Sequence, residues 1–188
     1  MKTHVAFSIV LQEVKMQNAI LDAIARRSSI RQYTDAPVSR EQLITIMKAA
    51  MAAPSGMNMQ PWEFVAIDKR EILDALGDAL PYAKMLHHAK AALVVCGDTA
   101  KECALPITLW PQDCAAATQN ALLAAEALGL GAVWTAVYPN EQLVAIVKNI
   151  LGLPENVLPF CVIPIGHPAK EGTPKDKFNP ERMHWNQF

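Results

Sequence analysis

Apolar positions in the first half of the chain recur at three- and four-residue intervals, which is the spacing of one face of an α-helix. The pattern predicts a first helix over residues 17–26. A second helix begins after Ser39, because Ser39 and Gln42 can form a capping box in which each side chain accepts the other residue's backbone N–H. Pro54 ends this second helix, since proline interrupts the helical hydrogen-bond ladder.

Two more helices have ends that the sequence predicts. Asp68 and Glu71 form a second expected capping box, and an apolar stripe follows it at helical spacing. Asn140 caps a helix that runs to Leu151, where Gly152 stops it. The stripe after Asp68 consists of Ile72, Leu73, Leu76 and Leu80.

Apolar runs between these helices predict four β-strands, which need not all be parallel. The run 91–97 is apolar throughout, which indicates a buried strand. Residues 111–128 instead predict a long alanine-rich helix that is apolar on nearly every side. A single domain has little room to surround such a helix, so a subunit interface would provide its second cover. The strands are expected at residues 62–67, 91–97, 131–138 and 158–166.

The composition narrows the class of protein. The 188 residues are 52% hydrophobic and 19% charged, which suits one domain with a sizeable core. A formal net charge of −1 shows no excess of basic residues, which argues against nucleic-acid binding. No apolar run is long enough to span a membrane. We interpret residues 1–15 as an N-terminal extension, residues 16–188 as a single domain, and the cytoplasm as the default location.

The cysteines and histidines do not have the spacing of a metal site. No two cysteines form a CxxC pair, which argues against both a zinc site and a disulfide framework. The side chains of His87 and His88 would diverge on a helix, so an ordinary surface pair is the better interpretation, and we expect no metal. The cysteines are Cys96, Cys103, Cys114 and Cys161.

One stretch, "RRSSIRQYTDAPV" at residues 26–38, has the chemistry of a phosphate site. Arginine presents a planar fork of donors to phosphate, and the hydroxyls of Ser28 and Ser29 can complete the contact. The local pattern alone favours a simpler interpretation, in which the arginines are solvated cations at the C-terminal end of a helix.

Three other stretches contain candidate groups, each with an ordinary structural alternative. "PSGMNMQPW" at 54–62 offers an Asn and a Gln to a ring edge, but a rigid surface turn is about equally compatible. "GAVWTAVYP" at 131–139 carries Trp and Thr on a strand, which is typical of core packing. "PKDKFNPER" at 174–182 is cationic, as solvated tails usually are.

Taken together, these stretches resemble the nitroreductase family of FMN-dependent oxidoreductases. The resemblance runs from about residue 17 to the C-terminus and is supported further by "PIGHP" and "NPERMHWN", in the family's order. It implies an α+β fold with a central, mostly antiparallel sheet flanked by helices, and an interwoven homodimer that binds FMN at the subunit interface. It also implies NAD(P)H as the electron donor.

The resemblance further implies roles for the matching residues. Arg27 matches the family arginine on the FMN phosphate, followed by Ser28 and Ser29, and Arg31 matches the basic residue near the pyrimidine end of the ring. Either Lys175 or Lys177 matches a distal phosphate cation, and Arg182 is a further candidate. Other matches face the ring or the ribityl chain: Pro54, Ser55, Met57 and Asn58, often from the other subunit, with Gln60 orienting their loop, and Trp134, Thr135 and Ala136 on a strand beside the ring.

The function implied by the resemblance is electron transfer from NAD(P)H through FMN to nitroaromatics, quinones or similar small-molecule acceptors in a ping-pong cycle. Alternatives are a reductase of enals, azo bonds or halogenated rings, and a flavin-binding protein without turnover. We assign no catalytic acid or base, because a proton can come from water. Tyr82 and Tyr138 are candidates, but core packing is the more usual role for each.

Overall fold

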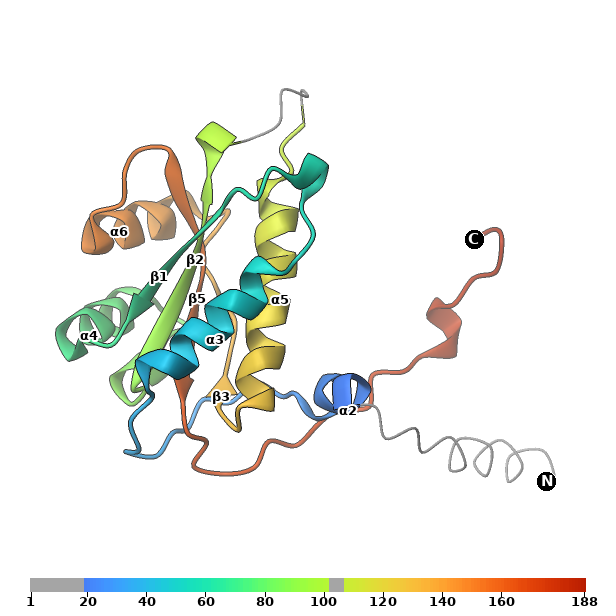
Figure 1. Ribbon diagram of the computed structural model, residues 1–188, viewed down its shortest axis with the longest axis horizontal. Helices are drawn as coiled ribbons and strands as arrows, with labels where there is room; N and C mark the ends of the chain where they lie inside the picture. Colours follow the sequence, from blue (N-terminus) through green and yellow to red (C-terminus); the bar gives the residue numbers. More distant parts are fainter. Residues whose placement is uncertain (1–18, 102–106) are drawn as a thin grey trace.

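A computed structural model describes residues 19–101 and 107–188. Its centre is one antiparallel sheet in the order β1-β2-β5-β3, with β4 also paired to β5 (Figure 1). The predicted extension, the first two residues of the predicted first helix, and Cys103 lie outside the described residues. The strands are β1 (Trp62–Ile67), β2 (Ala91–Asp98), β3 (Gly131–Ala132), β4 (Thr135–Ala136) and β5 (Val157–Gly166).

Helices cover both faces of this sheet. Figure 1 shows α3 and α5 on one face and α4 and α6 on the other, with α2 beside the lower end of α5. The helices are α2 (Ala19–Arg26), α3 (Arg40–Met51), α4 (Arg70–Ala79), α5 (Trp110–Ala127) and α6 (Glu141–Leu151). Short 3-10 turns are η1 (Gly56–Asn58), η2 (Lys84–His87), η3 (Thr99–Lys101) and η4 (Pro180–Arg182).

The place of β2 in the sheet explains why its residues 91–97 are apolar without alternation. Alternate side chains point to opposite faces of a strand. Leu93 and Val95 pack in the core beneath α3 and α5, whereas Val94 and Cys96 pack in the core beneath α4 and α6. Because helices cover both faces, a polar side chain at any of the buried positions 91–97 would lose its hydration.

Two of the predicted caps are confirmed. The Ser39 hydroxyl accepts the Gln42 N–H at 3.1 Å, and the Gln42 side-chain oxygen accepts the Ser39 N–H at 2.9 Å. The Asn140 side chain accepts the Leu143 N–H at 3.1 Å, and Gly152 ends α6 in the left-handed region with φ of 62°. Each cap pairs a backbone group that the helix itself leaves without a partner.

Removing the Ser39 cap should destabilise the fold by a modest amount. We expect Ser39→Ala to lower the free energy of unfolding by about 1 kcal/mol, because the first turn of α3 loses a hydrogen-bond acceptor. Urea denaturation of both proteins measures the difference. Ser39→Asn retains an accepting oxygen and should recover most of the loss, so equal destabilisation by Ala and Asn would contradict the cap's role.

Two predictions of local structure are wrong. The predicted capping box of Asp68 and Glu71 does not form. The residue that precedes α4 is Lys69, which makes no side-chain cap, and the Asp68 carboxylate instead accepts from Arg40 Nε at 3.0 Å. The predicted strand 131–138 is divided into β3 and β4, which both pair with β5. The division lies opposite Pro164, which has no N–H to contribute to a ladder.

The long helix α5 and the C-terminal tail differ in how the fold covers them. Buried alanines on α5 face the sheet, as Ala117 and Ala121 show, but much of the helix is only half-buried. The tail leaves β5, passes α2 and extends away from the body (Figure 1). Trp185 and Phe188 in this tail are exposed.

Candidate functional site

A cavity of about 450 Å³ lies between the end of α2 and the tail. Its lining contains four cationic side chains, and we call it the cationic cavity. Among the described residues, no Asp or Glu lines it. Its polar lining residues are Arg27, Ser28, Ser29, Arg31, Thr173, Lys175 and Lys177. An anion is therefore the ligand that this cavity suits.

Backbone contacts hold the segment after α2 against the sheet. Ile30 donates its N–H to Ala132 O at 3.0 Å, and the Tyr33 hydroxyl donates to Ile30 O at 2.7 Å. Burial raises the pKa of Tyr33, which keeps its hydroxyl protonated as a donor. The tail approaches closely at Gly172, where an added Cβ would lie 1.7 Å from Ser28 Oγ.

The cations of the cavity differ from neighbouring cations because no acidic side chain among the described residues pairs with them. Arg26 lies 3.8 Å from a Glu126 oxygen, and Lys90 lies 2.7 Å from an Asp35 oxygen. In contrast, Arg27, Arg31 and the two cavity lysines form no ion pair with any described residue. Their positive charges are thus available to an anionic ligand.

A second cavity, also of about 450 Å³, shares Arg31 with the first. We call it the aromatic cavity because Tyr82 and Trp134 line it. The Trp134 ring packs edge-on against Phe160, with 5.5 Å between ring centroids. The remaining lining residues are Pro81, Lys84, Met85, Thr135 and Ala136. Two cavities that meet at one arginine suit a ligand with an anionic group and a flat ring.

The Thr135 side chain already has a structural partner. Its hydroxyl donates to Val162 O at 2.6 Å inside the sheet. Ala136 is exposed beside it, so the cavity surface at this strand is formed by backbone and a methyl group. The Thr135 hydroxyl is therefore satisfied within the sheet, as the core-packing interpretation of this strand expected, and Thr135 also lines the aromatic cavity.

The loop 54–60 has a tightly specified backbone. Gly56 donates its N–H to buried Asp113 Oδ1 at 2.9 Å, and Gln60 donates its N–H to Ser55 Oγ at 3.0 Å. Left-handed φ values occur at three non-glycine residues, which costs roughly 1–3 kcal/mol per residue. These residues are Met57, Asn58 and Gln60. Backbone strain clusters at active sites, ligand clamps and switch regions, so this loop is a candidate for contact with a ligand.

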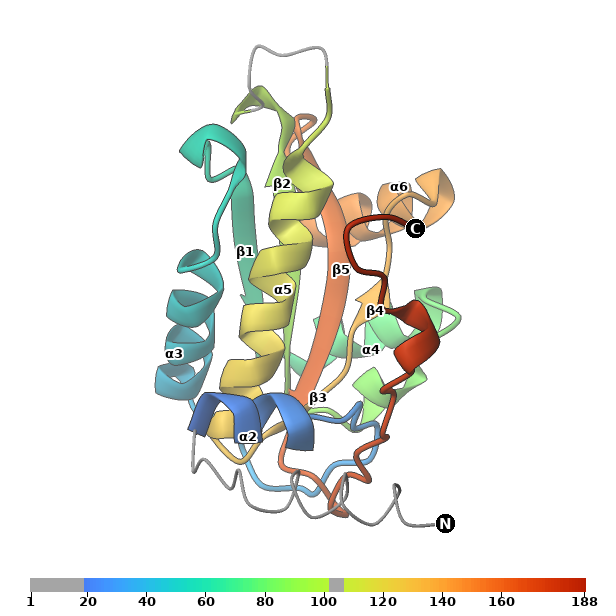
Figure 2. The same ribbon diagram turned by 90° about the vertical axis from the view of Figure 1, so that its right-hand side faces the viewer.

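This loop does not meet the cationic cavity within one chain. Its anchor Asp113 lies near the start of α5, whereas Glu126, which pairs with Arg26, lies near the end. These two acidic residues are about 20 Å apart along the helix axis. Figure 2 shows the same separation, with the turn η1 in teal at the top and α2 in blue at the bottom. The structure therefore gathers Arg27, Arg31 and the lysines but leaves the loop apart.

Three outcomes qualify the predicted residue set. Both Lys175 and Lys177 line the cationic cavity, so the lining does not choose between the two lysines that the sequence offered as the phosphate cation. Arg182 lies on exposed η4 and does not line either cavity. Sequence reasoning missed Pro81 and Met85, and it favoured a core role for Tyr82, whose exposed fraction is 81%.

The comparison with known proteins identifies the family. The model of the nitroreductase family matches residues 24–105 and 78–167, which include both cavities' segments before the tail. The chain belongs to the nitroreductase family. Its membership confirms the family assignment made from the sequence, and the antiparallel sheet between helices confirms the α+β fold class.

Individual relatives of this nitroreductase-family chain are similar over nearly its whole length. A protein of Archaeoglobus fulgidus, provisionally named an NADH dehydrogenase/NAD(P)H nitroreductase, is 45% identical over 87% of this chain and 95% of its own. A similarly named Bacteroides thetaiotaomicron crystal structure is 48% identical, with a TM-score of 0.87, over 92% of this chain and all of that one.

A third family structure includes a bound ligand. It is a provisionally named nitroreductase from Desulfovibrio desulfuricans, solved in complex with FMN. It is 32% identical to this chain with a TM-score of 0.78, and the match covers 92% of this chain and 99% of that one. The likeness therefore extends to a relative that binds the cofactor expected from the sequence.

Proposed function

We propose that this protein is an FMN-dependent oxidoreductase that transfers electrons from NAD(P)H to nitroaromatics, quinones or similar small molecules. It is an NAD(P)H-dependent enzyme of the nitroreductase family, and its cofactors are FMN and NAD(P)H. The observation that carries the proposal is the pair of cavities joined at Arg31.

The residues present fit FMN at both of its ends. The cationic cavity offers four charges and several hydroxyls to a phosphate, which arginine and lysine bind by charge-assisted hydrogen bonds. The aromatic cavity offers space next to Trp134 for a ring system. Arg31 lies between them, where its charge would favour an electron-rich ring and so assist two-electron chemistry.

The overall reaction balances with the two substrates and water. Bound FMN would accept a hydride from NAD(P)H and deliver two electrons to the acceptor. NAD(P)H and one proton convert a quinone to a hydroquinone, or a nitro group to a nitroso group and water. With the flavin ring beside Trp134, the remaining space of the aromatic cavity on the side of Tyr82 would take donor and acceptor in turn, as in a ping-pong cycle.

A homodimer would complete the site. A second copy whose α5 runs in the opposite direction would bring its loop 54–60 to the cavities of the first copy. The half-buried surface of α5 and the exposed Ile24, Trp185 and Phe188 provide apolar area for such contact. No helix among the described residues is both long and apolar enough to cross a membrane. The cytoplasmic location stays a prediction.

The test is the visible spectrum of the purified full-length protein. We expect flavin absorbance, either as isolated or after addition of FMN, that bleaches when NADH or NADPH is added without oxygen. Addition of meta-dinitrobenzene should then restore the absorbance. A protein that cannot take up FMN would contradict the proposal, and one that binds FMN without bleaching would be a flavin-binding protein without turnover.

A further inference from the structure

One wall of the aromatic cavity comes from residues 81–90, which connect α4 to β2. Four residues of this wall line the cavity: Pro81, Tyr82, Lys84 and Met85. Tyr82 is 81% exposed, so its ring lies at the rim of the cavity, away from the core. An aromatic ring left in solvent at the entrance to a cavity has surface available to a ligand.

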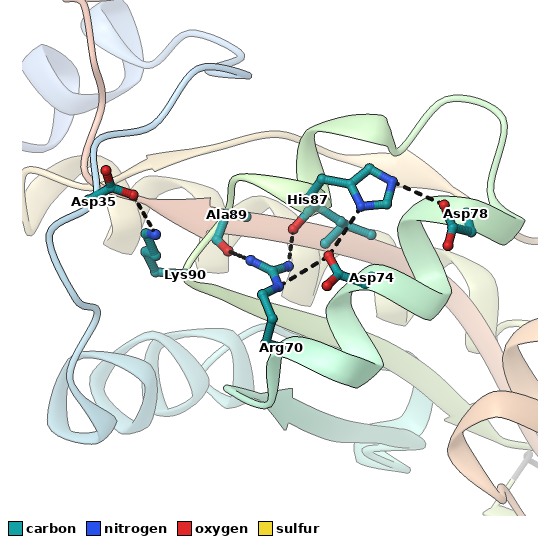
Figure 3. Close-up of polar contacts among 8 residues, drawn as sticks. Asp35, Arg70, Asp74, Asp78, His87, Ala89 and Lys90 are labelled. Atoms are coloured by element: carbon teal, nitrogen blue, oxygen red, sulfur yellow. Dashed lines mark hydrogen bonds and ion pairs between the residues drawn. The ribbon is translucent and has the colours of Figure 1, made fainter.

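Side chains of α4 hold this wall in place (Figure 3). Arg70 donates one hydrogen bond to Ala89 O at 2.9 Å and another to Leu86 O. Asp74 Oδ1 lies 3.1 Å from both Arg70 Nε and His87 Nδ1. These contacts hold residues 86–89, on the C-terminal side of Tyr82 and Met85, against α4.

The ammonium group of Lys84 also joins this wall to α4. It donates to Gly77 O at 2.9 Å and to Asp78 O at 3.1 Å, at the end of α4. These bonds direct its charge toward the helix end. Although Lys84 also lines the cavity, its charge is engaged at the end of α4, so Arg31 is the lining cation without such partners among the described residues. The aromatic side chains of the lining are Tyr82 and Trp134.

Resting on the proposed function, we infer that Tyr82 determines acceptor specificity by stacking on flat, electron-poor aromatic acceptors in the aromatic cavity. A phenol ring is electron-rich, and offset stacking with an electron-poor ring is favourable. Met85 adds a polarisable thioether beside the same space. Acceptors without a flat ring gain nothing from this contact, so the effect of Tyr82 is selective.

The experiment compares Tyr82→Leu with Tyr82→Phe in the full-length, FMN-loaded enzyme. Leucine retains apolar bulk without the ring, whereas phenylalanine retains the ring. We expect Tyr82→Leu to raise KM for meta-dinitrobenzene about three- to tenfold, which corresponds to the usual strength of one aromatic pair. Tyr82→Phe should stay within about twofold of the wild type. KM for ferricyanide, which has no flat ring, should be the same in all three proteins.

The flavin spectrum separates failure of this inference from failure of the proposed function. Bleaching by NADH or NADPH is recorded for every variant. Because Tyr82 is exposed at the rim and the flavin ring is assigned to the side of Trp134, we expect each variant to fold and bind FMN. A wild-type KM for meta-dinitrobenzene in a bleachable Tyr82→Leu enzyme would overturn the role of Tyr82 alone. An equal rise for ferricyanide would also overturn it, because the change would then be structural. A wild-type enzyme that is not bleached overturns both.

Discussion

Replacing Arg27 with alanine is expected to weaken FMN binding by about ten- to a hundredfold. Hydrogen bonds to a charged group contribute roughly 1.5–3 kcal/mol, and Arg27 is one of four cations that line the cationic cavity. It forms no ion pair with the described residues, so its removal would leave no acidic partner unpaired in the protein. Titration of the flavin-free protein with FMN, followed by flavin fluorescence, measures the dissociation constant.

The neighbouring arginine provides a matched control. Arg26 precedes Arg27 in the sequence, but it pairs with Glu126 and does not line the cationic cavity. We expect Arg26→Ala to leave FMN affinity within about twofold of the wild type, since exposed ion pairs contribute little to stability. Equal FMN affinity for the Arg27→Ala and wild-type proteins would remove Arg27 from the proposed site.

Replacing Asp113 with alanine is expected to affect both stability and FMN binding. Asp113 is 7% exposed and accepts the Gly56 N–H at 2.9 Å, which anchors the strained loop 54–60 to α5. Without this acceptor the backbone N–H loses a charge-assisted bond, and the free energy of unfolding should fall by about 1.5–3 kcal/mol. Urea denaturation measures this loss, and FMN titration shows whether the looser loop also reduces affinity.

An asparagine at the same position distinguishes the bond from the space that the side chain fills. Asp113→Asn keeps an oxygen that can accept from Gly56 and is nearly the same size. We therefore expect it to restore most of the stability and most of the FMN affinity. If Asn were as damaging as Ala, the negative charge near the start of α5 would be the important property, and not the hydrogen bond to the loop.

Sequence reasoning succeeded where neighbours along the chain decide the structure. The capping box of Ser39 and Gln42 joins residues three apart, and the left-handed stop at Gly152 depends on a single residue. The apolar run 91–97 of β2 reflects burial on both faces of the sheet, because each of its positions packs beneath helices. Arg27 and Arg31 are also close in sequence, so their convergence on one cavity needed little tertiary information.

Prediction failed where a distant partner competed for a local group. Asp68 has the spacing of a helix cap, but Arg40 from another helix binds its carboxylate. The run 131–138 has the composition of one strand, but it divides opposite Pro164 of β5. In both cases the deciding residue lies more than twenty residues away, so no local pattern contains it.

The sequence alone thus determined the family, the α+β class, most helix ends and the cationic segment, because these depend on local spacing and on motifs in a fixed order. Only the tertiary structure decided which residues share a cavity. It brought Lys175 and Lys177 from the tail to the cavity of Arg27, and it brought Tyr82 and Trp134 to a second cavity. It also separated the loop 54–60 from both cavities. The packing of the sheet and its helices determines which distant residues become neighbours. No local sequence pattern relates residues that lie so far apart in the chain.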